Sequence, residues 1–203
     1  FHKINSRNKI PKIINDLNSG KSVALVSDAG MPSICDPGEE LIKDARSIGI
    51  NVICIPGPCA AITALVTSGF PSSKFTFEGF LPRKKSEKTK ILLKISKNYK
   101  TTILYESPHR LKNLLNELKH HVGGEREIQV SRELTKKFEE HIGDSIDEVI
   151  NYFENKEVIG EITLIIKGRD KENQDLNFDK FELKKELIEL VKAGLSLSQA
   201  SKY

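Results

Sequence analysis

The sequence predicts an α/β fold with a parallel sheet, because short apolar runs alternate with helix-like stretches along its 203 residues. Hydrophobic residues make up 38% of the chain and charged residues 30%, which is enough apolar material to bury a core. By length, the chain allows one or two domains.

The first part of the chain reads as strand, helix, strand, helix. Apolar runs predict strands at Val23–Val26 and Asn51–Ile55. Between them, a helix is predicted from Asp36 to Ile48. Asp36 would be its N-cap, Pro37 its first residue and Glu39 the acidic residue of its first turn. After "PGP" a second helix is expected from Pro58 to Thr67, ending at Gly69. This alternation favours parallel strands joined by crossovers.

The second part mixes strands with amphipathic helices. Strands are predicted at Phe75–Glu78, Thr102–Tyr105, Glu127–Glu133 and Glu161–Lys167. Helices are predicted at about Glu87–Ser96, from Ser107 through the stripe Leu111, Leu114, Leu115, Leu118 and Val122, at Ile146–Phe153 and at Phe181–Val191.

Both ends of the chain look incomplete. Phe1 is not an initiator Met, and "GLSLSQASKY" opens a helix at Ser196 or Ser198 that runs for barely two turns. "GRDKENQDLN" has the composition of a linker. We therefore expect a site shared with further segments to be only partly represented here.

Charge and cysteine content narrow the class of protein. There are 32 Lys and Arg residues against 28 Asp and Glu, a net charge of +4 that tilts toward an anionic partner. No apolar run approaches the roughly 20 residues of a membrane span, and the start is no signal peptide, so we expect a cytoplasmic protein without a membrane partner. The three cysteines lack CxxC spacing and predict neither a disulfide framework nor a zinc site.

Two loops rich in small residues come after the first two predicted strands, "SDAGMP" and "PGPCAA". Ligands of open parallel sheets bind beyond the carboxyl ends of the strands, so both loops should face one cleft. Gly30 and Gly57 allow close approach to the backbone, and Ser27 or Asp28 can orient polar groups. Such loops suit a flat heteroaromatic ligand with a polar tail. The alternative is that these residues only turn the chain and pack helix against strand.

These loops and the motifs after them resemble a known family. "LVSDAGMPSICDPG", "PGPCAAITAL", "EGFLPRK", "YESPHRL", "SRELTKKFEE" and "GEITLII" occur in the order found in RsmI-type ribosomal small-subunit RNA (cytidine 2'-O)-methyltransferases, within the tetrapyrrole methylase superfamily. The resemblance implies a two-domain α/β fold, with a parallel-sheet N-terminal domain of which residues 1–70 are a part, a mixed-sheet C-terminal domain at 71–170, and a linker with an incomplete helical appendage at 171–203.

The same resemblance implies S-adenosylmethionine as cofactor. The residues expected along it are Asp28, Ala29, Gly30, Pro32, Gly57, Cys59, Ala60, Leu134 and Gly160. The family's usual "DAGTP" is "DAGMP" here, so Met31 replaces a hydroxyl side chain. The family's first strand and its acidic "EDTR" segment are absent from this sequence, so catalytic residues in them cannot be assigned.

The implied reaction is methyl transfer to the ribose 2'-hydroxyl of a cytidine in 16S ribosomal RNA, which needs no metal because the sulfonium is already activated. Charged residues where two strands end are the candidates for base or alkoxide stabilisation: Glu106, Arg110, Arg132, Glu133 and Lys136. The alternative is that these residues form structural ion pairs.

A basic run offers a site for RNA. From Arg83 to Lys100 the chain carries eight Lys or Arg residues against Glu87 alone, and the candidates for phosphate contacts are Arg83, Lys84, Lys85 and Lys88. The alternative is a solvated helix face.

Rival functions stay open at this point. Sister enzymes methylate tetrapyrroles or the modified histidine of an elongation factor, and a non-catalytic module binding S-adenosylmethionine or RNA is a further alternative. The expected partner is small ribosomal subunit RNA. Members of the superfamily commonly form dimers, so the resemblance implies a homodimer.

Overall fold

The computed structural model describes residues 6–170, 180–192 and 194–200. The chain divides into two compact units, Phe1–Arg169 and Asp170–Tyr203. The first unit holds a mixed sheet with its helices, and the second holds two helices.

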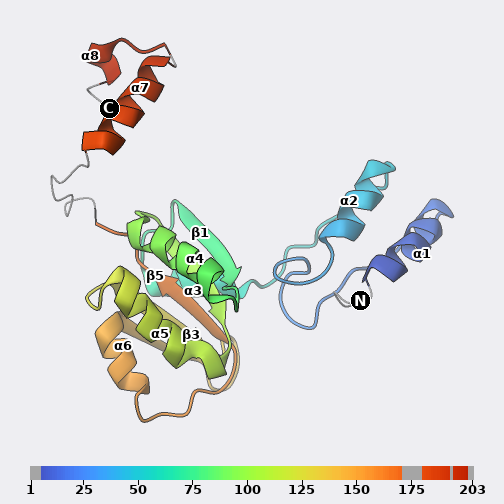
Figure 1. The fold of residues 1–203 in the computed structure, drawn as a ribbon. Helices are drawn as coiled ribbons and strands as arrows, with labels where there is room; N and C mark the ends of the chain where they lie inside the picture. Colours follow the sequence, from blue (N-terminus) through green and yellow to red (C-terminus); the bar gives the residue numbers. More distant parts are fainter. Residues whose placement is uncertain (1–5, 171–179, 193, 201–203) are drawn as a thin grey trace. The chain divides into compact units, whose positions relative to one another are not determined.

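A five-stranded sheet forms the centre of the first unit (Figure 1). Its strands are β1 (Phe75–Phe80), β2 (Thr101–Glu106), β3 (Glu127–Arg132), β4 (Glu140–Ser145) and β5 (Ile162–Ile166), in the spatial order β1-β2-β5-β3-β4. β1 and β2 are parallel, and every other neighbouring pair is antiparallel. The mixed sheet expected for this part of the chain is confirmed.

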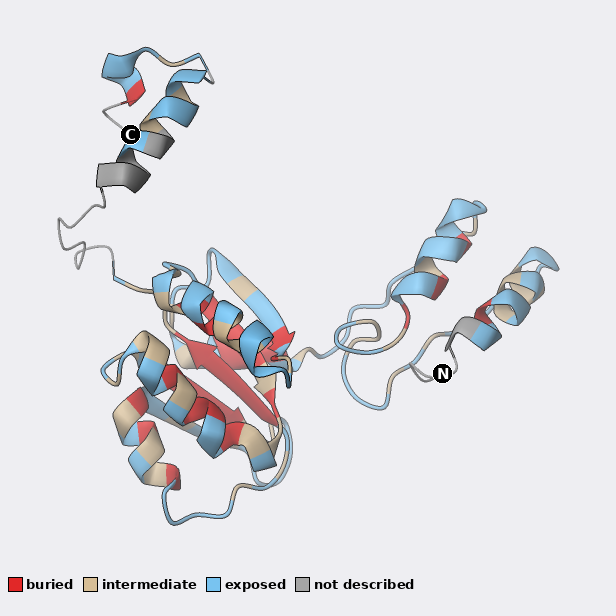
Figure 2. Cartoon of the chain, in the orientation of Figure 1, coloured by how far each residue is buried: buried red, intermediate tan, exposed pale blue. Residues whose placement is uncertain are grey.

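Helices cover both faces of the sheet. On one face, α4 (Lys85–Lys97), α5 (Pro108–Val122) and α6 (Ile146–Phe153) pack on the larger apolar core, which includes Leu104 and Leu164. On the other face, α3 (Ala60–Ser68) packs on Ile103 and Ile165. Successive residues of β2 and β5 thus enter opposite cores, as the alternation of side chains along a strand requires. Figure 2 shows the buried residues gathered in the strands and on the helix faces turned toward them.

The helices predicted after residue 80 in this unit are confirmed. The apolar stripe of α5 is buried, with Leu111, Leu114, Leu115 and Leu118 in the core and Val122 packed against it. Ser107 occupies the N-cap position of α5, but its side chain makes no capping hydrogen bond. Its backbone N–H instead donates to Glu106 Oε1 at 2.8 Å. At α6, Ser145 Oγ accepts from the Glu148 N–H at 3.2 Å, an ordinary side-chain cap.

Two predicted strands are wrong for this structure: Val23–Val26 and Asn51–Ile55 are irregular, and residues 6–70 contain no strand. Val26 is 80% exposed and Ile53 74% exposed. A strand is stabilised by hydrogen-bonded neighbours and a covered face. Neither segment pairs with another strand in the described part of the chain, so apolar sequence alone does not make it a strand.

The ordered helices before α3 are α1 (Ser6–Asn18) and α2 (Glu39–Ser47), which pack against each other. The predicted start of α2 at Asp36 is wrong, because Gly38 occupies the N-cap position and no side chain caps the helix. α3 ends as predicted at Gly69, whose φ of 67° is the left-handed conformation of a helix C-cap.

One strand was not predicted. β4 has the sequence "EHIGDS", which is polar and contains Gly, and it lies at the edge of the sheet with much of its surface exposed. An edge strand needs no apolar pattern because only one side of it pairs.

The second unit contains α7 (Lys180–Lys192) and α8 (Leu197–Ala200). The helix predicted at Phe181–Val191 is confirmed. Residues 171–179 of the predicted linker lie outside the described residues. In the described ranges, no helix is both long and apolar enough to cross a bilayer.

Candidate functional site

The ends of β2 and β3 bring the two charged motifs together. Glu106 at the end of β2 and Arg132 at the end of β3 are both register partners of Ile162, the first residue of β5. "YESPHR" and "SRELTK" are far apart in sequence but lie at the same end of the sheet. The central position of β5 therefore creates this cluster of charges.

Glu106 is buried and anchors the turn into α5. Its Oε1 accepts from the Ser107 N–H and lies 3.3 Å from Arg110 Nε. Arg110 also donates to the Leu81 carbonyl at 3.1 Å, which fixes the loop after β1. Glu106 Oε2 is buried and has no hydrogen-bond partner among the described residues.

Arg132 is held by Glu140 on the neighbouring strand β4. Arg132 Nε and one terminal nitrogen both lie 3.0 Å from Glu140 Oε2, and Tyr152 donates to the other carboxylate oxygen. The Tyr152 hydrogen bond lowers the pKa of Glu140, so this carboxylate is ionised and keeps Arg132 in place.

Glu133 and Lys136 form a second ion pair where the chain turns sharply. Glu133 has a φ of 52°, and its Oε1 accepts from the Glu161 N–H and from Lys136 Nζ, both at 2.9 Å. The hydrogen bond from the Glu161 N–H lowers the pKa of Glu133, and the Glu133 carboxylate raises the pKa of Lys136, so both are charged near neutral pH. A Cβ at Gly160 would lie 2.5 Å from the Glu133 side chain, which explains the glycine at this position.

All five catalytic candidates thus lie at one end of the sheet, each paired with an opposite charge. The structural alternative stated for them accounts for these contacts. A carboxylate with a lowered pKa is a weak general base, so Glu133 is better suited to hold Lys136 than to remove a proton.

The two loops of small residues lie side by side. A Cβ at Gly30 would be 3.4 Å from the Pro58 carbonyl, and a Cβ at Gly57 would be 3.1 Å from Met31 Sδ. Ser27 Oγ donates to the Gly30 carbonyl at 2.7 Å and closes the first loop. The predicted neighbourhood of the two loops therefore holds even though the strands expected before them do not form.

Tyr105 connects the second loop to the sheet. Its hydroxyl accepts from the Ala61 N–H, in the first turn of α3, at 3.1 Å. Burial raises the pKa of Tyr105 to about 12, so the phenol stays neutral. Cys59, Tyr105 and Leu134 each pack against the core under α3. Leu134 and Cys59 thus border the same apolar cluster.

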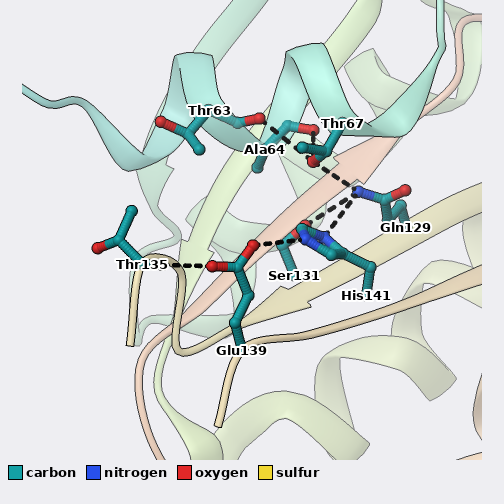
Figure 3. A network of polar contacts seen from close by, with 8 residues as sticks. All are labelled: Thr63, Ala64, Thr67, Gln129, Ser131, Thr135, Glu139 and His141. Carbon is teal, nitrogen blue, oxygen red and sulfur yellow. Dashed lines mark hydrogen bonds and ion pairs between the residues drawn. The ribbon is translucent and has the colours of Figure 1, made fainter. Parts of the chain in front are cut away.

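A polar network fixes the loop that carries Leu134 (Figure 3). Gln129 Nε2 lies 3.3 Å from Thr67 Oγ1 on α3 and 3.0 Å from Ser131 Oγ. Ser131 Oγ lies 3.0 Å from His141 Nδ1. The other ring nitrogen of His141 lies 2.9 Å from Glu139 Oε1.

Glu139 completes the network by accepting from the Thr135 N–H at 2.6 Å. Because a carboxylate only accepts, His141 donates to Glu139 through Nε2. Gln129 donates to both Thr67 and Ser131, and Glu139 accepts from both His141 and the Thr135 N–H, so these hydrogen bonds connect α3, β3, β4 and the loop. The network holds the loop from Glu133 to Glu139 in a fixed position relative to α3.

Sequence reasoning missed this network and Tyr105. Ser131 and His141 are opposite each other only because of the register between β3 and β4, which the sequence does not reveal. Ser131 is 1% exposed beneath α3, so it serves the network and cannot act as a nucleophile toward a substrate.

The four basic candidates for RNA contacts differ in their surroundings. Lys88 is mostly covered and pairs with Glu117 at 2.6 Å, and Lys84 pairs with Glu87 at 3.0 Å. Arg83 and Lys85 are exposed and have no ion-pair partner among the described residues. These two are therefore the cations most available to a phosphate.

Neither the surface pocket described next nor the metal-binding residue types of the described chain indicate another site. A hollow of about 570 Å³ is lined by Ser33, Glu39, Ile42, Lys43 and Arg46, none of which is a predicted cofactor contact. Within the described ranges, no group of three or more His, Cys, Asp or Glu residues could hold a metal ion.

Comparison with known proteins defines the class. A family model described as Tetrapyrrole (Corrin/Porphyrin) Methylases matches residues 2–150. Among solved structures, the methyltransferase CobJ has a TM-score of 0.61 at 17% identity, over 79% of this chain and 70% of that one. A uroporphyrin-III C-methyltransferase from Thermus thermophilus, complexed with S-adenosyl homocysteine, has a TM-score of 0.54 at 15% identity, over 80% and 73%. These likenesses confirm the predicted fold class.

Relatives found by sequence similarity define the family more narrowly than the structural likenesses do. A ribosomal RNA small subunit methyltransferase I from Bacillus subtilis is 47% identical over 86% of this chain and 60% of its own length. The protein of that name from Synechocystis is 39% identical over 100% of this chain and 72% of its own. The chain therefore belongs to the tetrapyrrole methylase family, in the branch of the ribosomal RNA small subunit methyltransferases I. It spans about 60% of the length of the first relatives.

We predict that His141→Asn frees the loop around Thr135, whereas His141→Gln does not. An Asn amide reaches only the position of Nδ1, while a Gln amide reaches that of Nε2 and still donates to Glu139. Exchange of the Thr135 amide, measured by NMR, should be faster by about 2- to 10-fold in the Asn variant, the worth of one hydrogen bond.

The matched control is His120→Asn on the exposed face of α5, which should leave Thr135 exchange unchanged. Unchanged exchange in His141→Asn would show that the network does not hold this loop.

Proposed function

We propose that the full-length protein transfers a methyl group from S-adenosylmethionine to the ribose 2'-hydroxyl of a cytidine in 16S ribosomal RNA. The observation that carries this proposal is the 47% identity, over 86% of the chain, to a protein named ribosomal RNA small subunit methyltransferase I. Tetrapyrrole methylation is the weaker candidate, since the neighbours with such titles are under 20% identical and share the fold alone.

The residue types of the two loops support S-adenosylmethionine as the ligand. Asp28, Ala29, Gly30 and Pro32 lie on one loop and Gly57, Cys59 and Ala60 on the other, while Leu134 packs on the same core as Cys59 and Gly160 lies beside Glu133. Glycines and small side chains leave backbone N–H and C=O groups open to a purine and to the amino-acid end of the ligand. We assign these nine residues to the cofactor.

The cofactor would supply a methyl carbon already activated by the positive sulfonium. The work left to the protein is to position the ribose hydroxyl and to stabilise the charge that develops on its oxygen. Of the five charged candidates, Lys136 is the cation best placed for this, since its side chain is 45% exposed and Glu133 holds its ammonium at the strand end. Arg110 and Arg132, fixed by Glu106 and Glu140, would add positive potential around it.

The proposal includes the setting in which the protein acts. The substrate is small ribosomal subunit RNA, which places the reaction in the cytoplasm, and the active form is proposed to be a homodimer. Arg83, Lys84, Lys85 and Lys88 are proposed as the RNA-binding cations, with Arg83 and Lys85 making the direct phosphate contacts.

We predict that the full-length protein, expressed with the sequence that flanks these residues in its gene, transfers label from methyl-labelled S-adenosylmethionine to undermethylated small subunits. Nucleoside digestion should place the label on 2'-O-methylcytidine. Label on a base or on another ribose would contradict the assigned position. Binding of S-adenosylmethionine without any label on assembled subunits would contradict the reaction itself.

We predict that the double variant Arg83→Glu, Lys85→Glu weakens binding of a single-stranded rRNA fragment and leaves cofactor affinity unchanged. Each lost phosphate contact should reduce the slope of log affinity against log salt concentration by about 0.7. The matched control is Lys94→Glu, Lys97→Glu at the far end of α4, which changes the net charge equally. Equal losses in the two double variants would show that overall charge, and not this end of the helix, binds the RNA.

A further inference from the structure

Phe80 presents an aromatic ring to solvent at the end of an edge strand. It is the last residue of β1 and is 54% exposed. A single exposed apolar residue is common on protein surfaces and means little by itself. Phe80 is distinguished by the aromatic rings behind it and by the basic residues that come after it in the chain.

The ring of Phe80 is backed by other aromatic rings. Its centroid lies 5.6 Å from that of Tyr105 at an interplanar angle of 57°. Nearby on β1, Phe77 meets Tyr105 edge to face at 5.1 Å. Tyr105 is itself fixed by the hydrogen bond from the Ala61 N–H. Phe80 therefore has a firm support and an open side.

Positively charged residues follow this ring closely in the chain. Arg83 and Lys85 are three and five residues after Phe80, and both are exposed without an ion-pair partner in the described part of the chain. The loop between them and the strand is held in place, since Leu81 is buried and its carbonyl accepts from Arg110. Proteins bind single-stranded nucleic acid with open aromatic rings for the bases and nearby cations for the phosphates, and this stretch of chain supplies both.

Tyr105, which packs behind this ring, also contacts the region of the proposed cofactor loops. Tyr105 contacts both Phe80 and the first turn of α3, where Cys59 and Ala60 lie. A Cβ at Gly79 would be 2.9 Å from Cys35 Sγ, so the chain just after "SDAGMP" reaches the same end of β1. Phe80 is therefore connected to both loops through the neighbouring residues Tyr105 and Cys35.

We propose that Phe80 is a stacking platform for one unpaired base of a single-stranded RNA segment, with Arg83 and Lys85 holding the adjacent phosphates. This inference rests on the proposed function and names its substrate as an unpaired nucleotide. Unstacked bases are what proteins read in RNA, because the deep major groove of an RNA helix excludes side chains. Two exposed cations without an ion-pair partner among the described residues follow the ring in the chain, so charge complementarity favours a polyanion.

These 203 residues contain no Trp, so a Trp introduced among them reports from a defined position, and the parent protein supplies the background fluorescence. In the full-length protein, Phe80→Trp places an indole fluorophore at the platform. Titration with oligocytidylate should quench its fluorescence to saturation, and added salt should weaken the binding. The matched control is Phe75→Trp, at the other end of the same strand, 39% exposed and about 17 Å away by strand rise. Its fluorescence should not change.

Removal of the ring should weaken binding without affecting the cofactor. Phe80→Ala should lower the affinity for oligocytidylate by roughly 5- to 150-fold, the range found for loss of one stacked base. Phe80→Tyr should retain the affinity. Binding of S-adenosylhomocysteine should be the same in the parent and in both variants.

Several outcomes overturn the inference. If oligocytidylate quenches both Trp variants, its bases do not lie specifically on Phe80. The same conclusion follows if it quenches neither variant while Arg83→Glu, Lys85→Glu still weakens its binding. Quenching by S-adenosylhomocysteine in place of the oligonucleotide would make Phe80 part of the cofactor site. Failure of the proposed function is separate: it would appear as saturable quenching of Phe80→Trp with no methyl transfer to small subunits, and the platform would then stand.

Discussion

The structure depends on the antiparallel pairing of β5 with β2 on one side and β3 on the other. β5 is the last strand in the sequence but the central one in the sheet, and all five of its residues are buried. Its side chains enter the core under α4, α5 and α6 and the core under α3 in alternation. Because Glu106 and Arg132 both pair with Ile162, the register of β5 also decides which charged residues meet. Fold and site therefore have the same origin.

Around this strand, the candidate site is assembled by contacts between segments far apart in the chain. Tyr105 connects the sheet to the first turn of α3, and Leu134 and Cys59 pack against the same core. The network through Ser131 and His141 then fixes the loop that carries Leu134. Ion pairs such as that of Glu133 with Lys136 lie at the strand ends, and both side chains of this pair are charged near neutral pH. Such preorganisation is what a methyl transfer requires, since positioning and electrostatics carry most of the catalysis.

Much of the fold could be predicted from the sequence where one element carries its own signal. The periodic leucines of α5 and the unbroken apolar run of β5 indicate a helix and a buried strand without knowledge of their partners. The prediction failed where structure depends on a neighbour: Val23–Val26 is apolar but unpaired, and β4 is polar but paired. The two loops of small residues were recognised from their motifs, whereas the contacts of Tyr105 and His141 and the exposure of Phe80 result from register and packing that no local pattern encodes.

The central claim is that the loops containing Gly30 and Gly57 together form the cofactor site. Calorimetry with S-adenosylhomocysteine on the full-length protein and its Gly57→Ala and Gly57→Trp variants tests it most directly. A Cβ at Gly57 would meet the flexible Met31 side chain at 3.1 Å, so the Ala variant should bind nearly as well as the parent. An indole would fill the space beside both loops, so the Trp variant should lose binding while its circular dichroism is unchanged. Equal affinity in all three proteins would contradict the account and place the cofactor elsewhere.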